Sequence, residues 1–220
     1  GVHSHMSHLF AFLKTAKENG INKIFIHIFT DGRDVPPQSA SGYIKELEKV
    51  ITDLGVGTIA SIEGRLYAMD RDHNWDRLAK VENVIFNGDG VVCDKVPSEF
   101  VEDLSKSGLV EVHVEPAIWV DNIGDKLVFE KGDGIFFFNF RADRARMMTS
   151  KILERKDAMN LMLVTMTDYG SEFKTIVAYS PLVIDTTLAK EISNQGLTQA
   201  HITETEKFDH ATYFLDGGVE

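Results

Sequence analysis

Hydrophobic and polar positions along the first third of the chain alternate between two periods. In residues 6–18 the apolar side chains fall three and four positions apart, which predicts a helix that ends at the Asn-Gly pair after it. Residues 23–29, KIFIHIF, form a short run of β-branched and aromatic side chains, which predicts a buried strand. The polar and proline-containing residues 30–37, TDGRDVPP, then predict a loop at the end of that strand.

The same alternation of helix and strand patterns continues to the end of the chain. We expect further helices over 39–55, 69–90, 98–108, from residue 142 onward and over 187–195, and further strands over 57–65, 111–120, 132–140 and 161–169. Ser39 stands where a side-chain cap of the second helix is expected. Strands that alternate with helices indicate an α/β fold, in which a mostly parallel sheet is flanked by helices in three layers.

Composition is that of a globular protein with a buried core. Hydrophobic residues make up 43% and charged residues 26% of the 220 positions, enough for one large or two modest domains. No apolar stretch approaches the roughly 20 residues of a membrane span, and the first residues lack the pattern of a signal peptide. Cys93 is the single cysteine, which suits a reducing compartment. We therefore expect a cytoplasmic protein that does not bind membranes.

The charge balance limits the kind of partner that the protein can have. The formal net charge is -11, with 23 Lys and Arg residues against 34 Asp and Glu residues. Nucleic acids are bound by broad basic surfaces that neutralise phosphates, so we expect no nucleic-acid partner. Any site for an anion has to be local.

Arginines provide such a local site, because they follow the ends of three predicted strands. The clearest case is FFFNFRADRAR, residues 136–146, where an apolar strand leads directly into three arginines. The arginines at strand ends are Arg33, Arg65, Arg71, Arg141 and Arg144. The carboxyl ends of parallel strands meet at one edge of a sheet, and ligands of α/β proteins bind there. A planar guanidinium binds carboxylate or phosphate oxygens in pairs, so this edge predicts a site for a small polyanion.

Simple surface pairing is the alternative for each of these arginines. Aspartates lie close to all five in the sequence, and an exposed pair with one of them would contribute little. Arg77, Arg146 and Arg155 fall on predicted helices away from the strand ends, and we interpret these three as surface residues.

Histidines are concentrated at the start of the chain, in GVHSHMSH. The spacing of His3, His5 and His8 suggests a zinc site, but no cysteine or acidic residue lies nearby, so the support for a metal is weak. We favour the interpretation that His3 donates to an anion at the N-terminus of the first helix. His5 and His8 would then cap or pack.

Five motifs together resemble a known family. GVHSH, DGRDVPP, GRLYAMDRD, FFFNFRADR and TETEKFDHATYFLDGG occur in this order between residues 1 and 220. In type, order and spacing they are similar to the cofactor-independent (2,3-bisphosphoglycerate-independent) phosphoglycerate mutases. Full-length members of that family are much longer, and the chain resembles only the inserted substrate-binding (phosphotransferase) domain.

The resemblance implies a division of the chain and a set of missing parts. Residues 1–185 would form the substrate-binding α/β domain, and residues 186–220 a C-terminal helix and segment that leads to a metal-binding, phosphatase-like domain. That other domain would carry two manganese or similar divalent ions and the serine that is phosphorylated, so no metal or cofactor is expected in this chain. The family also has a strand ending in Ser-Asp-Gly directly before the segment matched by GVHSH, and its absence here leaves the edge or centre of the sheet in question.

Roles for individual residues also follow from the resemblance. The residues it assigns to substrate are His3, Arg33, Asp34, Arg65, Arg71, Arg141, Arg144 and Lys207. Asp34 and Lys207 would be catalytic, Asp34 by accepting the proton of a glycerate hydroxyl and Lys207 by lying near the phosphoryl group. The alternatives are a plain salt bridge for Asp34 and a surface position for Lys207.

Three functions remain open at this point. The resemblance favours the substrate-holding domain of a mutase that interconverts 3-phosphoglycerate and 2-phosphoglycerate through a phosphoserine on the missing domain. The chain alone would then be inactive, and its partners would be the two phosphoglycerates and that domain. The alternatives are a non-catalytic module that binds phosphoglycerate or a similar anion and, more remotely, a zinc-dependent hydrolase built on the three N-terminal histidines.

Overall fold

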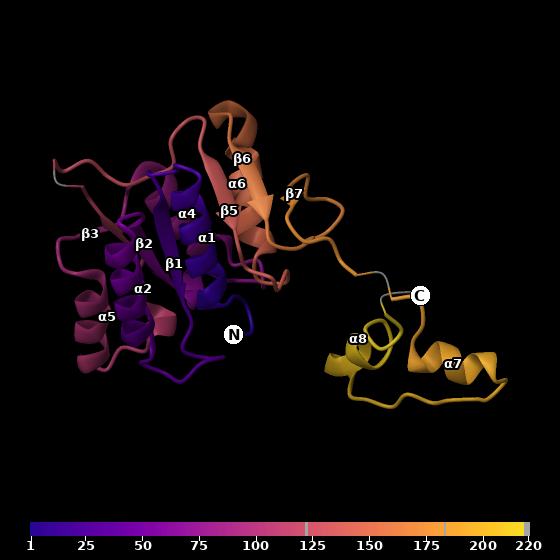
Figure 1. The fold of residues 1–220 in the computed structure, drawn as a ribbon. Helices are drawn as coiled ribbons and strands as arrows, with labels where there is room; N and C mark the ends of the chain where they lie inside the picture. Colours follow the sequence, from indigo (N-terminus) through magenta and orange to yellow (C-terminus); the bar gives the residue numbers. More distant parts are fainter. Residues whose placement is uncertain (122, 183, 218–220) are drawn as a thin grey trace. The chain divides into compact units, whose positions relative to one another are not determined.

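Two compact units make up the protein, Gly1–Tyr179 and Ser180–Glu220. The computed structural model describes residues 1–121, 123–182 and 184–217 (Figure 1). The first unit contains both β-sheets and most of the helices, and the second contains short helices joined by loops.

The strands of the first unit form two sheets, where the sequence predicted one. The larger sheet has the order β1 (Phe25–Thr30), β2 (Thr58–Gly64), β4 (Ala117–Trp119), β3 (Val91–Cys93), and the smaller has the order β5 (Gly134–Phe137), β6 (Met162–Thr165), β7 (Ile176–Val177). All neighbouring strands are parallel except β2 and β4. The prediction of a mostly parallel α/β fold is therefore confirmed.

Helices cover both faces of these strands. One core cluster joins the strands to the helices α1 (Met6–Glu18), α2 (Ala40–Leu54) and α5 (Pro97–Lys106). A second cluster involves α3 (Arg65–Ala68), α4 (Trp75–Glu82), the π-helical turn η1 (Asn83–Asn87) and α6 (Arg146–Met159). Within β4, Ala117 and Trp119 belong to the first cluster and Ile118 to the second, as the two-residue period of a strand requires. The result is the expected arrangement of three layers.

Three sequence predictions of secondary structure are wrong in detail. The helix expected from Ala142 begins only at Arg146. The helix expected over 69–90 begins only at Trp75, because Asp70 accepts hydrogen bonds from the backbone of Asp72 and Asn74 and so favours a loop before α4. The strand expected over 111–120 is a 3₁₀ turn, η2 (Glu111–His113), followed by β4. The strands β3 and β7 were not predicted, since they contain only three and two residues.

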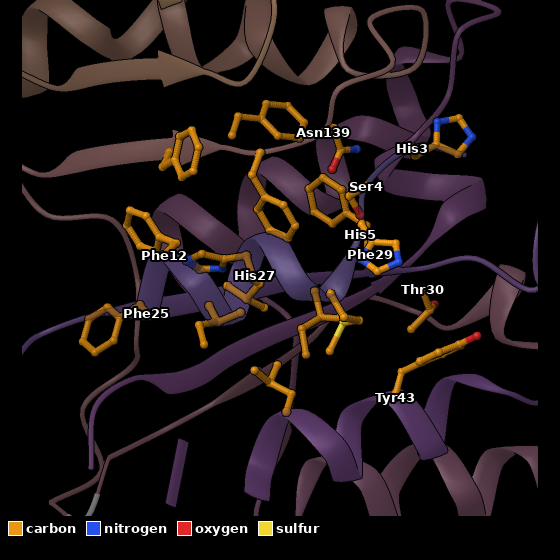
Figure 2. Close-up of a pocket in the computed structure, with 18 of the residues that line it drawn as sticks. His3, Ser4, His5, Phe12, Phe25, His27, Phe29, Thr30, Tyr43 and Asn139 are labelled. Atoms are coloured by element: carbon orange, nitrogen blue, oxygen red, sulfur yellow. The ribbon is translucent and has the colours of Figure 1, made fainter. Parts of the chain in front are cut away.

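A large apolar cavity lies between the two sheets. Strands β1 and β5 are the terminal strands of their sheets, and residues of both line a cavity of about 900 Å³. Figure 2 shows the aromatic side chains of Phe12, Phe25 and Phe29 around it. At one end, the backbone N–H of Phe140 donates a 2.8 Å hydrogen bond to the carbonyl of His3. Residues of both sheets thus line one cavity, but among the described residues no strand of one sheet pairs with a strand of the other.

The second unit contains α7 (Leu188–Asn194), the turn η3 (Thr205–Lys207) and α8 (Phe208–Ala211). The predicted helix over 187–195 is confirmed as α7, and the side chain of Thr187 caps its N-terminus. Many large apolar side chains of this unit are exposed, among them Leu182, Leu188, Ile202 and Phe214. Within the described ranges, no helix is long and apolar enough to cross a membrane.

Candidate functional site: an arginine-rich edge of the sheet

The loop after β1 provides the first acidic groups of the site. Asp31 accepts hydrogen bonds from the backbone N–H groups of Arg33 and Asp34, which closes a tight turn around Gly32. Gly32 has a φ of +72°, and a Cβ atom there would lie 2.9 Å from the side chain of Glu111. Glycine is required at this position both for its conformation and for the close approach.

Glu111 holds this loop and the start of α2. Its buried carboxylate accepts hydrogen bonds from the backbone N–H groups of Gln38 at 2.6 Å, Ser39 at 2.9 Å and Ala40 at 3.3 Å. Its own backbone carbonyl accepts from the hydroxyl of Thr30 at 2.7 Å. The predicted cap by the Ser39 side chain is wrong, because that side chain makes no capping bond and Glu111 satisfies the helix N-terminus instead.

Arg65 connects the ends of β1 and β2. Its side chain is only 8% exposed, and its guanidinium donates hydrogen bonds to the carboxylates of both Asp31 and Asp34. Burial by itself would lower the pKa of Arg65, but these two bonds outweigh it and raise that pKa. The same bond from Arg65 is the main reason that the pKa of Asp34 is lowered, so Asp34 is ionised at neutral pH.

His3 completes this cluster from the start of the chain. Its Nε2 atom lies 2.9 Å from Oδ2 of Asp34, and its ring is buried. Burial lowers the pKa of His3, against the opposing effect of Asp34, so the ring is neutral at neutral pH. Since an ionised carboxylate can only accept a hydrogen bond, Nε2 carries the ring proton and donates a hydrogen bond to Asp34. Nδ1 is then an acceptor, and it is buried with no partner among the described residues.

A second carboxylate organises the arginines of two other loops. Asp143 accepts from Arg141 through both of its oxygens, at 2.8 and 3.2 Å, and from Arg71 at 3.0 Å. Burial would raise the pKa of Asp143, but the bonds from Arg141 and Arg71 lower it. These two arginines are about half exposed.

Arg144 joins the two clusters. It donates a 2.8 Å hydrogen bond to the backbone carbonyl of Met69, in the loop that also carries Arg71. Burial lowers its pKa, and the positive charges of Arg65 and Arg71 lower it further. The charge of Arg141 has the same effect on the pKa of His3. Guanidinium groups that follow two strands, β2 and β5, therefore lie close enough to act on one another.

The structure thus places most of the predicted site residues in one region of the first unit. Those brought together are His3, Asp34, Arg65, Arg71, Arg141 and Arg144. The side chain of Arg33 is exposed beside Asp34 and has no hydrogen bond or ion pair within the described part of the chain. Lys207 belongs to the second unit, where it pairs with Glu204 at 2.9 Å. The roles assigned to these residues stay predictions.

The three N-terminal histidines make different contacts. His3 donates to Asp34, and its expected donation to an anion stays a prediction. His5 caps α1 by accepting from the backbone N–H of Ser7, and His8 packs edge-on against Phe140, so the prediction that these two cap or pack is confirmed. Across residues 1–121, 123–182 and 184–217, no group of three or more His, Cys, Asp or Glu side chains could hold a metal ion. The resemblance places the two divalent ions in the other domain, and we derive no step through them.

The remaining arginines were predicted to lie on the surface. Arg146 is exposed and donates to the carbonyl of Tyr169, and Arg77 is half-exposed beside Asp70. Arg155 is more enclosed than expected, because it pairs with Glu82 and lies 4.7 Å above the ring of Phe86.

Three acidic residues of the site were missed as members of it. Asp31, Asp143 and Glu111 hold the arginines or the loop that carries them. Asp31 and Asp143 lie next to the arginine motifs in the sequence and could have been found there. Glu111 gave no such signal, since it contacts residues more than 70 positions away.

Fold and site together define an α/β domain with an arginine-rich edge, and comparison with known proteins shows its class. The family model described as BPG-independent PGAM N-terminus (iPGM_N) matches residues 1–171. The chain therefore belongs to the phosphoglycerate mutases, and within them to the 2,3-bisphosphoglycerate-independent family, of which it matches the N-terminal part.

Similar proteins support this assignment and show how much of the family's length is present. Proteins named 2,3-bisphosphoglycerate-independent phosphoglycerate mutase are 40% identical in Moorella thermoacetica and 41% identical in Clostridium botulinum, over 100% of this chain and 44% of each relative. A crystal structure of Leishmania mexicana phosphoglycerate mutase at low cobalt concentration superposes with a TM-score of 0.76 at 26% identity, over 99% of this chain and 43% of that one. The chain thus spans less than half the length of its relatives.

Proposed function

We propose that this chain is the substrate-holding domain of a phosphoglycerate mutase that interconverts 3-phosphoglycerate and 2-phosphoglycerate. The observation that carries the proposal is the set of guanidinium groups that follow β2 and β5 and lie near Asp34 and His3, in a chain of this family. Both substrates carry a carboxylate and a phosphate, and arginine binds each of these with paired hydrogen bonds. Arg33 and Arg71, with their exposed side chains, would provide the contacts nearest to solvent.

The chemistry of phosphoryl transfer accounts for such a site. The transition state spreads negative charge over three equatorial oxygens, so that fixed positive charges and correct positioning supply most of the catalysis. A mutase must also keep the glycerate bound while its phosphate resides on the enzyme. Arginines that grip the carboxylate from several loops would prevent its loss between the two transfers.

Asp34 would act on the hydroxyl group that is attacked or released. It is ionised at neutral pH because of Arg65, so that it can accept a proton. His3, which donates to the same carboxylate oxygen, would orient it. Transfer of the hydroxyl proton to Oδ2 would weaken both bonds, and return of the proton would restore them.

The remaining parts of the activity would come from outside residues 1–179. We propose that a phosphatase-like domain supplies the nucleophilic serine and two manganese or similar divalent ions, and that Lys207 reaches the phosphoryl group at the junction with that domain. The exposed apolar side chains of residues 180–217 support a role of this second unit as part of the connection. The predicted boundary between 185 and 186 stays a proposal, as does a cytoplasmic location.

We further propose that an extended segment occupies the cavity between β1 and β5. The family strand expected directly before Gly1 is the occupant to which we commit. Both bordering strands are terminal in their sheets, and the cavity is lined by apolar side chains from both. A strand inserted there would satisfy both edges and join the two sheets into one.

Assays of the longer protein and of this chain test the proposed function. The full-length protein should interconvert 3- and 2-phosphoglycerate, whereas the 220-residue chain should show no turnover with or without manganese. Binding without turnover by the full-length protein would favour the non-catalytic module. Turnover by the chain alone would contradict the proposed division of the chemistry.

A further inference from the structure

Among the described residues, Asp143 is the carboxylate that accepts hydrogen bonds from both Arg71 and Arg141. Its Oδ1 accepts from Nε of Arg141 at 2.8 Å, and its Oδ2 accepts from Nη2 of Arg141 at 3.2 Å and from Nη1 of Arg71 at 3.0 Å. Arg71 and Asp143 are 72 residues apart. A single side chain therefore fixes the loop after α3 to the loop after β5.

Most hydrogen-bond donors of these two arginines remain available for a ligand. A guanidinium has five N–H donors, and Asp143 takes two from Arg141 and one from Arg71. Both side chains are nearly half exposed, at 46% for Arg141 and 48% for Arg71. An anion can therefore bind to both without displacing Asp143.

We propose that Asp143 is a positioning residue, which holds the guanidinium groups of Arg71 and Arg141 side by side so that they bind one phosphate or carboxylate group together. Without it, two positively charged side chains with many rotamers repel each other and have to be ordered by the ligand, which weakens binding. The inference rests on the proposed function only for the identity of the natural anion.

The direction of one effect separates this role from simple electrostatics. Asp143 is itself negative and lies next to the donors that an anion would use. If it contributed only its charge, its neutralisation would remove a repulsion and strengthen anion binding. If it positions the two arginines, its neutralisation weakens anion binding.

Inorganic phosphate is the probe, and its affinity for the full-length protein is measured by titration calorimetry. We expect Asp143→Asn to weaken phosphate binding by about tenfold, since the amide NH₂ replaces a charge-assisted acceptor. Asp143→Glu, which keeps the charge but moves it, should give a smaller loss. Asp89→Asn is the matched control, because Asp89 is an exposed aspartate that pairs with Lys126, and it should leave the affinity unchanged. Arg71→Lys should cost affinity in the unaltered protein but little in the Asp143→Asn background.

Unchanged or tighter phosphate binding by Asp143→Asn would overturn the proposal. If that variant does not fold, Asp143→Glu decides, and an affinity equal to that of the unaltered protein would overturn it. Failure of the unaltered protein to bind phosphate would contradict the positioning role and the anion site together. Phosphate binding that weakens as expected, in a protein that does not interconvert phosphoglycerates, would contradict only the proposed function.

Discussion

The guanidinium of Arg65 donates a hydrogen bond to the carboxylate of Asp34 across 31 residues of sequence, from the end of β2 to the loop after β1. Arg65 is almost fully buried, and the carboxylate of Asp34 is 29% exposed. The ion pair therefore has one rigid, enclosed partner and one partner that is open to a ligand. This asymmetry suits a side chain that has to be oriented and yet reach a substrate.

Replacing Arg65 by lysine tests whether this orientation is required. Nη1 of Arg65 donates to both Asp31 and Asp34, and the ammonium of lysine lies on a shorter, more flexible side chain, so the loop after β1 loses its fixed anchor. We expect kcat/KM of the full-length protein to fall by on the order of 2 kcal/mol, expressed as transition-state stabilisation. Arg77→Lys is the control, since its half-exposed side chain makes a long 3.3 Å contact with Asp70, and it should change kcat/KM by less than about 0.5 kcal/mol. Equal effects at the two positions would contradict the anchoring role.

Glu111 and Ser39 form a pair of variants with opposite expectations. Glu111→Gln places an amide NH₂ against one of the backbone N–H groups that the carboxylate now satisfies, so the free energy of unfolding should fall by about 2 kcal/mol. Ser39→Ala removes a hydroxyl that makes no capping bond, and it should be nearly silent. Urea unfolding of both variants measures the difference. A larger loss from Ser39→Ala would mean that the serine, as the sequence suggested, caps α2.

These two residues also show how far sequence reasoning reached. The period of the hydrophobic positions located β1, β2 and β5, and the arginines after those strands followed directly from that placement. Ser39 matched the local pattern of a cap, but a buried carboxylate from a distant turn satisfies the same N–H groups. Local patterns describe neighbours in sequence, and they carry no information on a partner 72 residues away.

The division into two sheets was equally beyond the sequence patterns. A strand with one unpaired edge has the same apolar composition as a strand paired on both sides, so β1 and β5 gave no sign that they end their sheets. Asp31 and Asp143 were noticed only as neighbours of arginines. Their role in spacing those arginines depends on contacts between loops that are far apart in the chain.

Glu63 should make the stability depend on pH in a direction opposite to that of an ordinary carboxylate. It is fully buried in β2, and burial raises the pKa of its carboxyl group from 4.5 to about 8. At a pH between these two pKa values, Glu63 holds a proton in the folded protein and has released it in the unfolded chain. The contribution to stability is therefore fully present below pH 4.5 and is lost as the pH rises through about 8, with a slope of up to about 1.4 kcal/mol per pH unit.

His27 opposes this trend at lower pH, which defines the window for the measurement. It pairs in register with Ser61, two positions before Glu63, and burial lowers its pKa from 6.5 to about 4. Stability from His27 thus rises with pH between these values, and the lowered pKa of His3 acts in the same direction. Both effects fade above pH 6.5, so the decrease from Glu63 dominates from there to about 8. Glu63→Gln should abolish the decrease of unfolding free energy over that window, whereas Glu46→Gln, at an exposed position of α2, should retain it. A decrease that survives in Glu63→Gln would assign it to another group.

The unpaired edges of β1 and β5 lead to a prediction for hydrogen exchange. An edge strand leaves alternate N–H groups without a partner in its sheet, and those groups exchange readily with water. If the family strand expected before Gly1 inserts between β1 and β5, the amides of both strands become protected in the longer protein. The central strands β2 and β6 are already paired on both sides and should be protected to a similar extent in either form.

Exchange should therefore be compared by mass spectrometry between the 220-residue chain and a form that begins with that additional segment. We expect peptides that cover Phe25–Thr30 and Gly134–Phe137 to gain protection in the extended form, and peptides that cover β2 and β6 to serve as the internal control. Substituting Phe12 by lysine should reverse part of the gain, because its ring lines the cavity and packs 5.1 Å from that of Phe136, where a charge would be buried on insertion. Protection of β1 and β5 that is already complete in the 220-residue chain would show that the two edges are closed by the chain itself, and the inserted strand would have to be placed elsewhere.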